Sequence, residues 1–229
     1  MSLSVDMALN AIAHYPMSLI PANTHLSLRE RQNAAVRSEI VQSGIKRFLD
    51  CGFDETTTDE IADDVGVSRR TVFRHFPTKE DIVLSGPLAS VGQLRAAVAA
   101  CPANEPPLVC MQSTLVKHVA AQAERHPGAL LIAKLIEKTP RLRSRSHELT
   151  DAWESALTEG LIDRNPDQAA QAPLISVVAV ATARLGARRW LAADGAITLT
   201  ASINHAFDEL ALVGLLKVSS SPSSRSTPS

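Results

Sequence analysis

Hydrophobic residues recur at helical spacing along most of this 229-residue chain. The first periodic segment covers 28–51, where small or apolar positions fall four residues apart on one helical face: Val36, Ile40, Gly44 and Phe48. Gly52 then provides a stop, because glycine readily adopts the left-handed conformation that ends many helices. A short helix that Thr57 or Thr58 can cap follows, and Gly66 breaks it. The next helix is predicted at Arg69–His75, with Ser68 as its cap.

The pattern after His75 predicts a longer array of helices. Thr78 and Asp81 stand three residues apart, as in an acidic variant of the capping box. Gly86-Pro87 is expected to kink or break the helix that they begin, because proline removes a backbone hydrogen bond. Further helical segments are predicted at 88–101, 108–125, 129–138, 141–161, 168–191 and 197–217. No strand pattern competes with them, so the predicted fold class is all-α.

These segments divide the chain into four parts. Residues 1–27 are expected to form a loosely ordered N-terminal arm, and 28–84 a three-helix unit that contains a helix-turn-helix. Residues 85–217 are expected to form a larger helical domain, followed by a disordered, serine- and proline-rich tail at 218–229. The first 28 residues contain no Lys or Arg and no continuous apolar stretch, so they match neither a signal peptide nor a membrane anchor.

Composition narrows the class of protein. The formal net charge is only −1, so the chain as a whole does not indicate nucleic-acid binding. Any contact with DNA would have to come from a local patch of positive charge. The cysteines Cys51, Cys101 and Cys110 are odd in number and lack CxxC spacing. Neither a disulfide framework nor a zinc site is therefore expected, and a reducing cytoplasm fits. Redox sensing by Cys101 and Cys110 stays open as the alternative to incidental thiols.

Positive charge is concentrated in the stretch SRRTVFRHF at 68–76. A short helix that follows a glycine turn and carries Arg69, Arg70 and Arg74 suits insertion into a DNA groove better than it suits catalysis. The surrounding unit is acidic, since residues 29–85 hold nine Lys and Arg against eleven Asp and Glu. We therefore predict binding through a few placed contacts and not a general affinity for DNA. A solvated helix face, or a helix-turn-helix that serves only as a scaffold, is the alternative.

The motifs Ala62…Gly66-Val67-Ser68, Thr71-x-Phe73-x-His75-Phe76 and Lys79-Glu80 together resemble the N-terminal DNA-binding domain of the TetR family, over about 29–84. The segment SRRTVFRHFPTKED at 68–81 is similar to actinobacterial members of that family. The resemblance implies that 68–75 is a recognition helix for the major groove of an operator. The DNA contacts that it implies are Thr57, Thr58, Ser68, Arg69, Arg70, Thr71, Phe73, Arg74, His75 and Lys79.

Within this implied contact set, Arg69 and Arg70 take positions that read bases or face phosphates, and His75, Lys79 and Thr58 take positions that hold the backbone. Two residues depart from the family pattern. Phe73 stands where tyrosine is common, so a hydroxyl bond to phosphate is lost and apolar packing is retained. Asp59 stands where some members carry a basic residue that reads bases.

The resemblance also implies that the C-terminal domain binds a small effector and forms a homodimer. The helices at about 168–191 and 197–217 would pair with their copies in a four-helix interface, and an ordinary intrachain core is the alternative. The helices before them would enclose a cavity, for which the candidate wall residues are Leu115, Val119, Leu131, Leu135, Trp153, Leu157 and Val178. Only 3% of residues are aromatic, which favours an aliphatic ligand such as a fatty acid or acyl thioester.

Basic stretches in the C-terminal domain bear on the same question. Arg141, Arg143 and Arg145, and Arg184, Arg188 and Arg189, offer guanidinium groups that could hold the phosphates of an acyl-CoA. A solvated surface is the alternative. The Gly86-Pro87 break stands between the two domains, and we expect it to help couple effector binding to DNA binding.

The sequence therefore predicts a cytoplasmic, ligand-responsive transcriptional regulator, a repressor that a small apolar effector releases from its DNA operator. No cofactor, metal or membrane partner is expected. The histidines show no HExxH spacing, and no GxSxG, phosphate-binding loop or dinucleotide fingerprint occurs. A helical enzyme or scaffold is the competing hypothesis, but no convincing nucleophile–base pair supports an enzyme.

Overall fold

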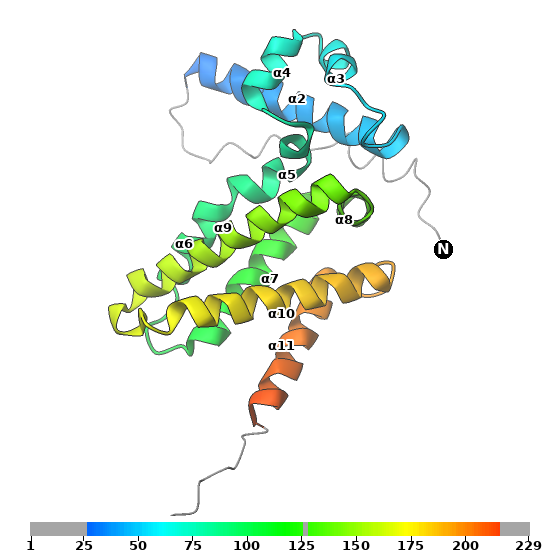
Figure 1. The fold of residues 1–229 in the computed structure, drawn as a ribbon. Helices are drawn as coiled ribbons and strands as arrows, with labels where there is room; N and C mark the ends of the chain where they lie inside the picture. Colours follow the sequence, from blue (N-terminus) through cyan, green and yellow to red (C-terminus); the bar gives the residue numbers. More distant parts are fainter. Residues whose placement is uncertain (1–26, 126–127, 216–229) are drawn as a thin grey trace, which may run out of the picture.

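The structure is a computed structural model that describes residues 27–125 and 128–215 (Figure 1). These residues form helices and one 3-10 turn with no strand, so the predicted all-α class is confirmed. The elements are α2 Leu28–Asp50, α3 Thr58–Val65, α4 Arg69–His75, α5 Lys79–Ala89, α6 Val91–Ala99, α7 Pro107–Arg125, α8 Ala129–Lys138, α9 Pro140–Arg164, η1 Pro166–Gln168, α10 Ala172–Ala192 and α11 Leu199–Leu215. The arm expected at 1–27, apart from Ser27, and the tail expected at 218–229 lie outside the described residues.

The helix starts of the N-terminal unit follow from local side-chain chemistry. Reciprocal capping boxes begin three helices, with Ser27 and Glu30 at α2, Thr57 and Glu60 at α3, and Thr78 and Asp81 at α5. The Ser68 hydroxyl accepts a bond from the Thr71 amide and so caps α4. Gly66 ends α3 with a φ of 69°, a conformation that costs glycine little. The helix-turn-helix is therefore built largely by signals within a few residues of each other.

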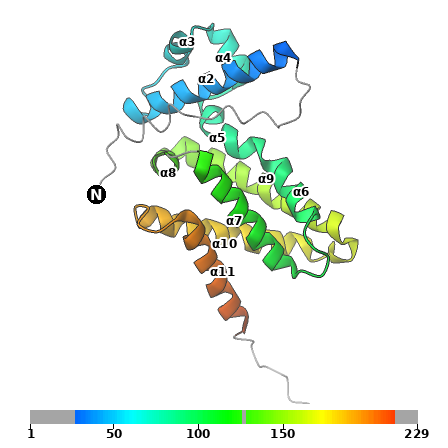
Figure 2. The same ribbon diagram turned by 180° about the vertical axis from the view of Figure 1, so that it is seen from behind.

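Two apolar cores hold the molecule together. The N-terminal core is formed mainly by α2, α3, α4 and α5, and its fully buried side chains include Ile40, Phe48, Ile61, Val72 and Ile82. The C-terminal core is formed by α6, α7, α9, α10 and α11, and includes Leu94, Met111, Leu115, Leu157 and Phe207. In Figures 1 and 2, α2–α4 lie across one end of the molecule, while α10 crosses the opposite end beside α11.

The N-terminal core is completed by helices from the C-terminal half. Leu142 near the start of α9 is fully buried within it, and Ile132 and Ile136 of α8 pack against it. Arg145 of α9 also forms an ion pair with Asp81 at the start of α5, with an N–O distance of 3.0 Å. The two predicted domains therefore share an apolar contact and a charged one.

The break that we predicted at Gly86-Pro87 lies three residues later. Helix α5 continues through Pro87 to Ala89, and the chain turns at Ser90 before α6 begins. The Ser90 hydroxyl and amide both bond to the Pro87 carbonyl, at 2.8 and 3.3 Å. Pro87 has no backbone N–H to donate within α5. The chain nevertheless changes direction only at Ser90, where these two bonds are made.

Length and mean hydropathy alone would allow Arg69–Ala99 to cross a membrane. In the structure this stretch is three separate helices, because the chain leaves helical geometry at Phe76–Thr78 and again at Ser90. Its main apolar side chains are also buried inside the two cores, among them Ile82, Leu84 and Val98. Packing within the protein explains the hydropathy of the stretch.

Candidate DNA-binding surface and effector cavity

The outer face of α4 presents two arginines that are open to solvent. Arg70 and Arg74 are exposed and lie one helical turn apart. Neither makes a hydrogen bond or an ion pair with any residue that the structure describes. Phe73 beside them keeps 40% of its surface exposed. Two guanidinium groups and an aromatic ring therefore face outward from the second helix of the helix-turn-helix.

Arg69, the first residue of α4, is engaged by the neighbouring helix. Its guanidinium lies 3.2 Å from the carboxylate of Asp59 on α3, and 5.3 Å from the centre of the Phe73 ring. Both charged side chains of this pair are more than half exposed, so the pair contributes little to stability. The pair does hold the Arg69 guanidinium near the Phe73 ring. Asp59, which departs from the family pattern, thus orients Arg69.

Two of the four hydroxyl residues in the predicted contact set, Thr57 and Ser68, are helix caps. The Thr57 hydroxyl accepts a bond from the Glu60 amide, and the Ser68 hydroxyl lies 2.9 Å from that of Thr71. Thr57 and Ser68 are exposed, whereas Thr58 and Thr71 are half-buried. These groups lie at the amino ends of α3 and α4, where the helix dipole and free amides favour anions.

Lys79 is held inside the N-terminal unit. Its ammonium group donates to the backbone carbonyls of Phe53 and Thr56, at 2.8 and 2.9 Å, and lies 4.8 Å from the Phe53 ring centre. The ammonium therefore fastens the turn between α2 and α3 to the start of α5. A direct phosphate contact by Lys79 would compete with these bonds.

His75 is likewise turned inward. Its backbone carbonyl accepts a bond from Arg37, and its Nε2 atom is buried without a partner among the described residues. Burial lowers the pKa of His75 below its usual value of 6.5, and the charges of Arg74 and Arg37 lower it further. The ring is therefore neutral at pH 7, and it has no positive charge to offer a phosphate.

Acidic residues of α3 are neutralised from α2. Arg47 holds Asp64 through two hydrogen bonds, one of 2.7 Å between Nη2 and Oδ1, and the Ser43 hydroxyl donates a third. The bonds from Arg47 lower the pKa of Asp64 to about 2, although desolvation acts in the opposite direction. The negative charge of Asp64 is therefore paired with Arg47 of α2 and not with a residue of α4.

An apolar cavity of about 290 Å³ lies between the two cores. Its wall is almost entirely hydrophobic and comes from α2, α5, α7, α8, α9, α10 and α11 together. The wall residues include Ile45, Val83, Pro87, His118, Val119, Ile132, Ala133, Ile136, Trp153, Arg184, Trp190 and Ile203. We call this space the effector cavity, after the effector that the sequence predicts for the C-terminal domain.

Two of the seven residues that we predicted for the wall of a ligand cavity line this one, and five lie elsewhere. Val119 and Trp153 line the effector cavity. Leu115 and Leu157 do not, because they point into the C-terminal core and are fully buried there. Leu135 packs against the N-terminal core, and Leu131 and Val178 also lie outside the wall. Hydrophobic periodicity identifies buried faces, but it does not distinguish a face that meets another helix from one that meets an empty space.

A few polar groups meet this apolar wall. The His118 Nε2 atom lies 3.1 Å from the Ser90 hydroxyl, and the His118 ring meets Trp153 edge-on with 5.3 Å between ring centres. The Trp153 Nε1 atom is buried and has no hydrogen-bond partner among the described residues. Among the residues that the structure describes, Arg184 is the one charged residue of the wall, and it is exposed. The cavity thus combines a large apolar surface with one unused donor and one cation.

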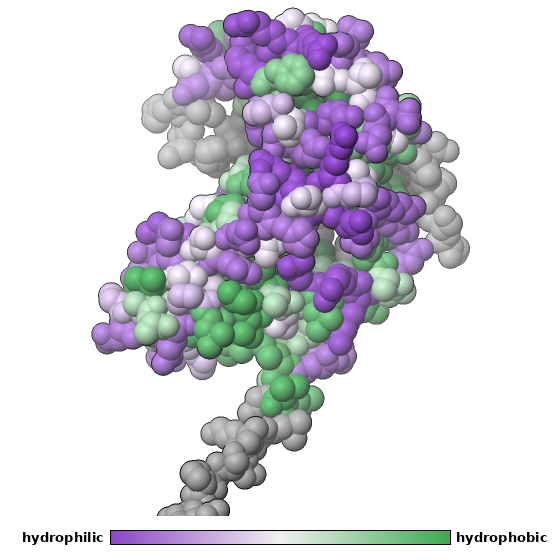
Figure 3. All heavy atoms as spheres, viewed as in Figure 1, coloured by the Kyte–Doolittle hydropathy of each residue, from purple (hydrophilic) through white to green (hydrophobic). Residues whose placement is uncertain are grey.

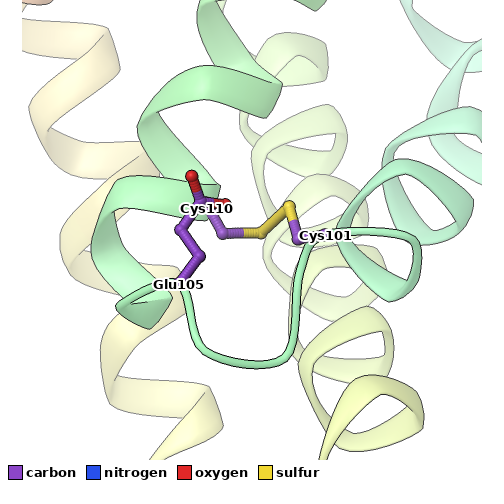
Figure 4. A group of neighbouring side chains, drawn as sticks. All are labelled: Cys101, Glu105 and Cys110. Carbon is purple, nitrogen blue, oxygen red and sulfur yellow. A yellow bond between two sulfur atoms is a disulfide. The ribbon is translucent and has the colours of Figure 1, made fainter.

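Two of the cysteines are joined. Figure 4 shows a disulfide between Cys101, after α6, and Cys110 in the first turns of α7, with Glu105 beside it. The expectation of buried or incidental thiols was wrong in that the pair is bonded, because the turn at 100–106 brings the two residues to a Cα distance of 6.1 Å. The three possible ligand atoms lie within 4.8 Å of one another, but sulfurs bonded to each other offer no thiolate to a metal. Cys51 is free and exposed.

Two family models match the chain: "Bacterial regulatory proteins, tetR family" over residues 40–85, and "MftR C-terminal domain" over residues 105–213. The HTH-type transcriptional regulator TcmR of Streptomyces glaucescens is 30% identical over 195 residues, which cover 80% of this chain and 86% of that protein. This chain belongs to the TetR family of transcriptional regulators. The resemblance seen in the sequence at 29–84 is therefore confirmed, and it extends through the C-terminal domain.

Further relatives agree with this TetR-family assignment. The HTH-type transcriptional repressor AcnR of Corynebacterium diphtheriae is 28% identical over 145 residues, 62% of this chain and 68% of that protein. The crystal structure of Thermus thermophilus FadR, a TetR-family repressor in complex with lauroyl-CoA, has a TM-score of 0.52 at 24% identity. That match covers 84% of this chain and 99% of FadR, and it shows the shared fold. The chain is accordingly a DNA-binding transcriptional regulator, as predicted.

This TetR-family chain also has an exposed apolar surface at the end far from α4. Figure 3 shows hydrophobic side chains gathered on α10 and on the projecting part of α11. Leu174 and Val177 on α10 are 69% and 45% exposed, and Leu212 and Val213 on α11 are 63% and 64% exposed. We call these four residues the α10–α11 patch. A clustered apolar patch on a soluble protein generally marks an interaction surface.

Proposed function

We propose that this regulator binds its operator as a homodimer through the outer face of α4, and that an apolar effector in the cavity releases it. The observation that carries the proposal is the composition of the cavity wall. Ile45 of α2 and Val83 of α5 belong to the N-terminal core, yet they line the effector cavity together with Trp153 and Ile203 of the C-terminal domain. A bound effector would therefore touch the DNA-binding unit itself.

The DNA contacts that we propose centre on Arg70 and Arg74. Arg70 lies near the amino end of α4, where a guanidinium can reach the two major-groove acceptors of guanine. Arg74 lies one turn later and is placed to meet a phosphate. Arg69, oriented by Asp59 and Phe73, is a second candidate for base contact, and Phe73 packs against the DNA backbone.

The remaining residues of the predicted contact set receive two different roles. Thr57, Thr58, Ser68 and Thr71 lie at helix amino ends and are proposed to bind phosphate oxygens there. Lys79 and His75 are proposed to support the unit from within, because the first is bonded to backbone carbonyls and the second is neutral and turned inward. The matched family model covers all these residues and is consistent with either role for the last two.

The effector that best suits the cavity is aliphatic and carries one hydrogen-bond acceptor. The apolar wall favours hydrocarbon, and the buried Trp153 Nε1–H group would donate to a carbonyl or carboxylate oxygen. Arg184 is placed to meet an anionic group at the cavity surface. These features fit a fatty acid or a fatty acyl thioester such as acyl-CoA, a class that includes the lauroyl-CoA of the FadR complex.

Of the other arginines considered for phosphate binding, two are already paired. Arg145 bonds to Asp81 and Glu148, and Arg189 bonds to Glu209. Arg141, Arg143 and Arg188 are exposed and do not line the effector cavity, so the proposal for an anionic effector rests on Arg184.

Release follows if the effector binds one arrangement of the helices better than the other. Ile132 and Ile136 of α8 face both the effector cavity and the N-terminal core, and Arg145 ties α9 to the start of α5. A coupling of about 1–3 kcal/mol between the two sites is sufficient for a 5- to 150-fold change in operator affinity. We propose that α8 and α9 carry this coupling, together with the turn at Ser90.

The homodimer is proposed to form through the α10–α11 patch. Leu174 and Val177 face solvent from α10, and Leu212 and Val213 do so from α11, so two copies related by a twofold axis would bury both pairs. Helices of this length can form a four-helix interface. Sedimentation of Leu174→Glu and Val213→Glu variants tests the proposal, since dimer dissociation without unfolding is the expected result.

Operator binding is tested by salt-dependent binding of the purified protein to DNA from around its own gene. A specific footprint, weakened in Arg70→Ala, supports the proposal. The absence of any specific site would favour the scaffold or enzyme alternative. Since the proposed partner is chromosomal DNA, we place the protein in the cytoplasm.

The effector site is tested by filling the cavity. Ala133→Phe puts a ring into the effector cavity, while Glu137→Phe puts the same ring on the exposed side of α8. With lauroyl-CoA and dodecanoic acid as probes, we expect operator release by one of them from the wild type and from Glu137→Phe, but not from Ala133→Phe. Equal release from all three proteins would place the effector elsewhere.

A further inference from the structure

The turn between α6 and α7 holds a chemical site that the proposed function does not use. The disulfide between Cys101 and Cys110 closes the turn that joins the two helices, as Figure 4 shows. Arg164 of α9 fastens the same turn from the other side by donating to the backbone carbonyls of Ala103 and Glu105. A protein that binds chromosomal DNA works among thiol reductants, where a disulfide is usually transient and serves sensing or catalysis.

The two cysteines differ sharply in access. Cys110 has no exposed surface and is part of the C-terminal core. Cys101 is partly exposed and lines a cleft of about 630 Å³ between α6 and α7, together with Gln93, Glu105 and Lys117. The cleft wall does not include Cys110. A reagent of tripeptide size can therefore approach the sulfur of Cys101, whereas Cys110 can be reached only by Cys101 itself.

We propose that Cys101 and Cys110 form a reversible redox site that exchanges with low-molecular-weight disulfides entering the α6–α7 cleft. In the reduced protein, the Cys101 thiolate attacks one sulfur of glutathione disulfide, whose S–S bond breaks and releases one glutathione thiolate. The Cys110 thiolate then attacks the Cys101 sulfur and expels the second glutathione thiolate. The two protons of the protein thiols pass to the two released glutathione thiolates, so one disulfide is gained and one is lost.

The site lies next to the effector cavity. His118 belongs to the walls of both the α6–α7 cleft and the effector cavity, and it bonds to Ser90 at the turn between α5 and α6. The disulfide holds the end of α6 against the start of α7, so oxidation restrains both the helix that carries His118 and the helix that begins after its partner Ser90. The oxidised protein therefore resists the helix movement that releases DNA.

The exchange is tested by mass spectrometry, in a Cys51→Ser background because Cys51 is free and exposed. The reduced protein is treated with glutathione disulfide in the presence of a chelator, quenched with an alkylating reagent and digested. The Cys51→Ser protein should lose two hydrogen atoms and retain no glutathione. Adding Cys110→Ser should trap one glutathione on Cys101, and adding Cys101→Ser should leave Cys110 unmodified on the same time scale.

Two results would overturn the exchange. One is modification of Cys110 in the Cys101→Ser variant as fast as modification of Cys101 in the Cys110→Ser variant. The other is stable glutathionylation of both cysteines in the Cys51→Ser protein. Circular dichroism melting of each variant shows whether the fold is retained, so that exposure by unfolding is recognised. None of these measurements uses DNA or effector, so they stand or fall apart from the proposed function.

A second measurement tests the consequence for regulation. In the Cys51→Ser background, the concentration of lauroyl-CoA or dodecanoic acid that releases half of the operator should be about tenfold higher for the oxidised than for the reduced protein, a change typical of coupled sites. The Cys101→Ser Cys110→Ser pair should show the same value under both conditions. An oxidised protein that releases DNA at the same effector concentration as the reduced one would refute the link to regulation.

Discussion

Replacing Lys79 by methionine separates two roles that DNA-binding lysines can have. The sequence resemblance assigns this lysine to the phosphate backbone, but its ammonium group donates to the carbonyls of Phe53 and Thr56. A hydrogen bond to a charged group contributes about 1.5–3 kcal/mol, and water can replace part of these bonds at a half-buried position. We therefore expect Lys79→Met to lower the free energy of unfolding by about 2 kcal/mol.

Urea denaturation measures this loss of stability, and a melting scan should show a fall of about 4–8 °C in Tm for a protein of this size. Operator affinity is then measured against salt concentration, well below the Tm of the variant. Each lost phosphate contact reduces the slope of log K against log salt by about 0.9, hence by about 1.8 in a dimer. For Lys79→Met we expect an unchanged slope.

Arg74→Met is the matched control, because Arg74 is exposed and makes no bond to any described residue. It should reduce the slope by about 1.8 and leave the free energy of unfolding within about 0.5 kcal/mol of the wild type. The reasoning would be refuted by a Lys79→Met variant that keeps full stability and whose slope of log K against log salt falls by about 1.8. Lys79 would then exchange its carbonyl partners for phosphate when DNA binds.

Three further predictions concern packing and pH. Gly186→Ala would place a Cβ atom 2.6 Å from the Ile203 Cα atom, so we expect a loss of about 1–3 kcal/mol in urea denaturation despite the better helix propensity of alanine; a gain would mean that α10 and α11 pack loosely. Asp64 has a pKa of about 2, below its ordinary 3.8, so the stability that it contributes is complete above pH 3.8 and is lost as pH falls towards 2. Asp64→Asn should make the loss of stability in acid less steep, and an unchanged loss would mean that the pair with Arg47 does not cause it. The pKa of His75 is lowered from 6.5, so the unfolded chain binds its proton more readily and stability falls as pH drops below 6.5; His75→Phe should reduce that fall, as measured by denaturation at successive pH values.

Local sequence signals predicted the N-terminal unit well. The stop at Gly66 and the caps at Ser68 and Thr78 are found where the sequence placed them, because each depends on residues within one helical turn. The family followed from the same stretch, since it is confirmed by matches that begin at residue 40. The homodimer and the individual DNA contacts stay predictions.

The cavity wall was harder to predict for a physical reason. Leu115 and Val119 lie one turn apart on α7 and are equally apolar, yet only Val119 faces the effector cavity. Which of two such residues meets empty space depends on the angles at which neighbouring helices cross. Those angles result from packing among several helices at once, and no short stretch of sequence records them.

The sequence by itself determined the helical class, the helix-turn-helix and its concentrated positive charge, because periodicity, caps and charge act over a few residues. Only the tertiary structure decided that Leu142 completes the N-terminal core, that Lys79 fastens a turn, and that Cys101 meets Cys110. Each of these contacts joins residues from different helices or across a turn, where a small rotation of a helix exchanges one neighbour for another. The DNA-binding element could therefore be recognised from its own residues, whereas the cavity and the Cys101–Cys110 disulfide required the assembled fold.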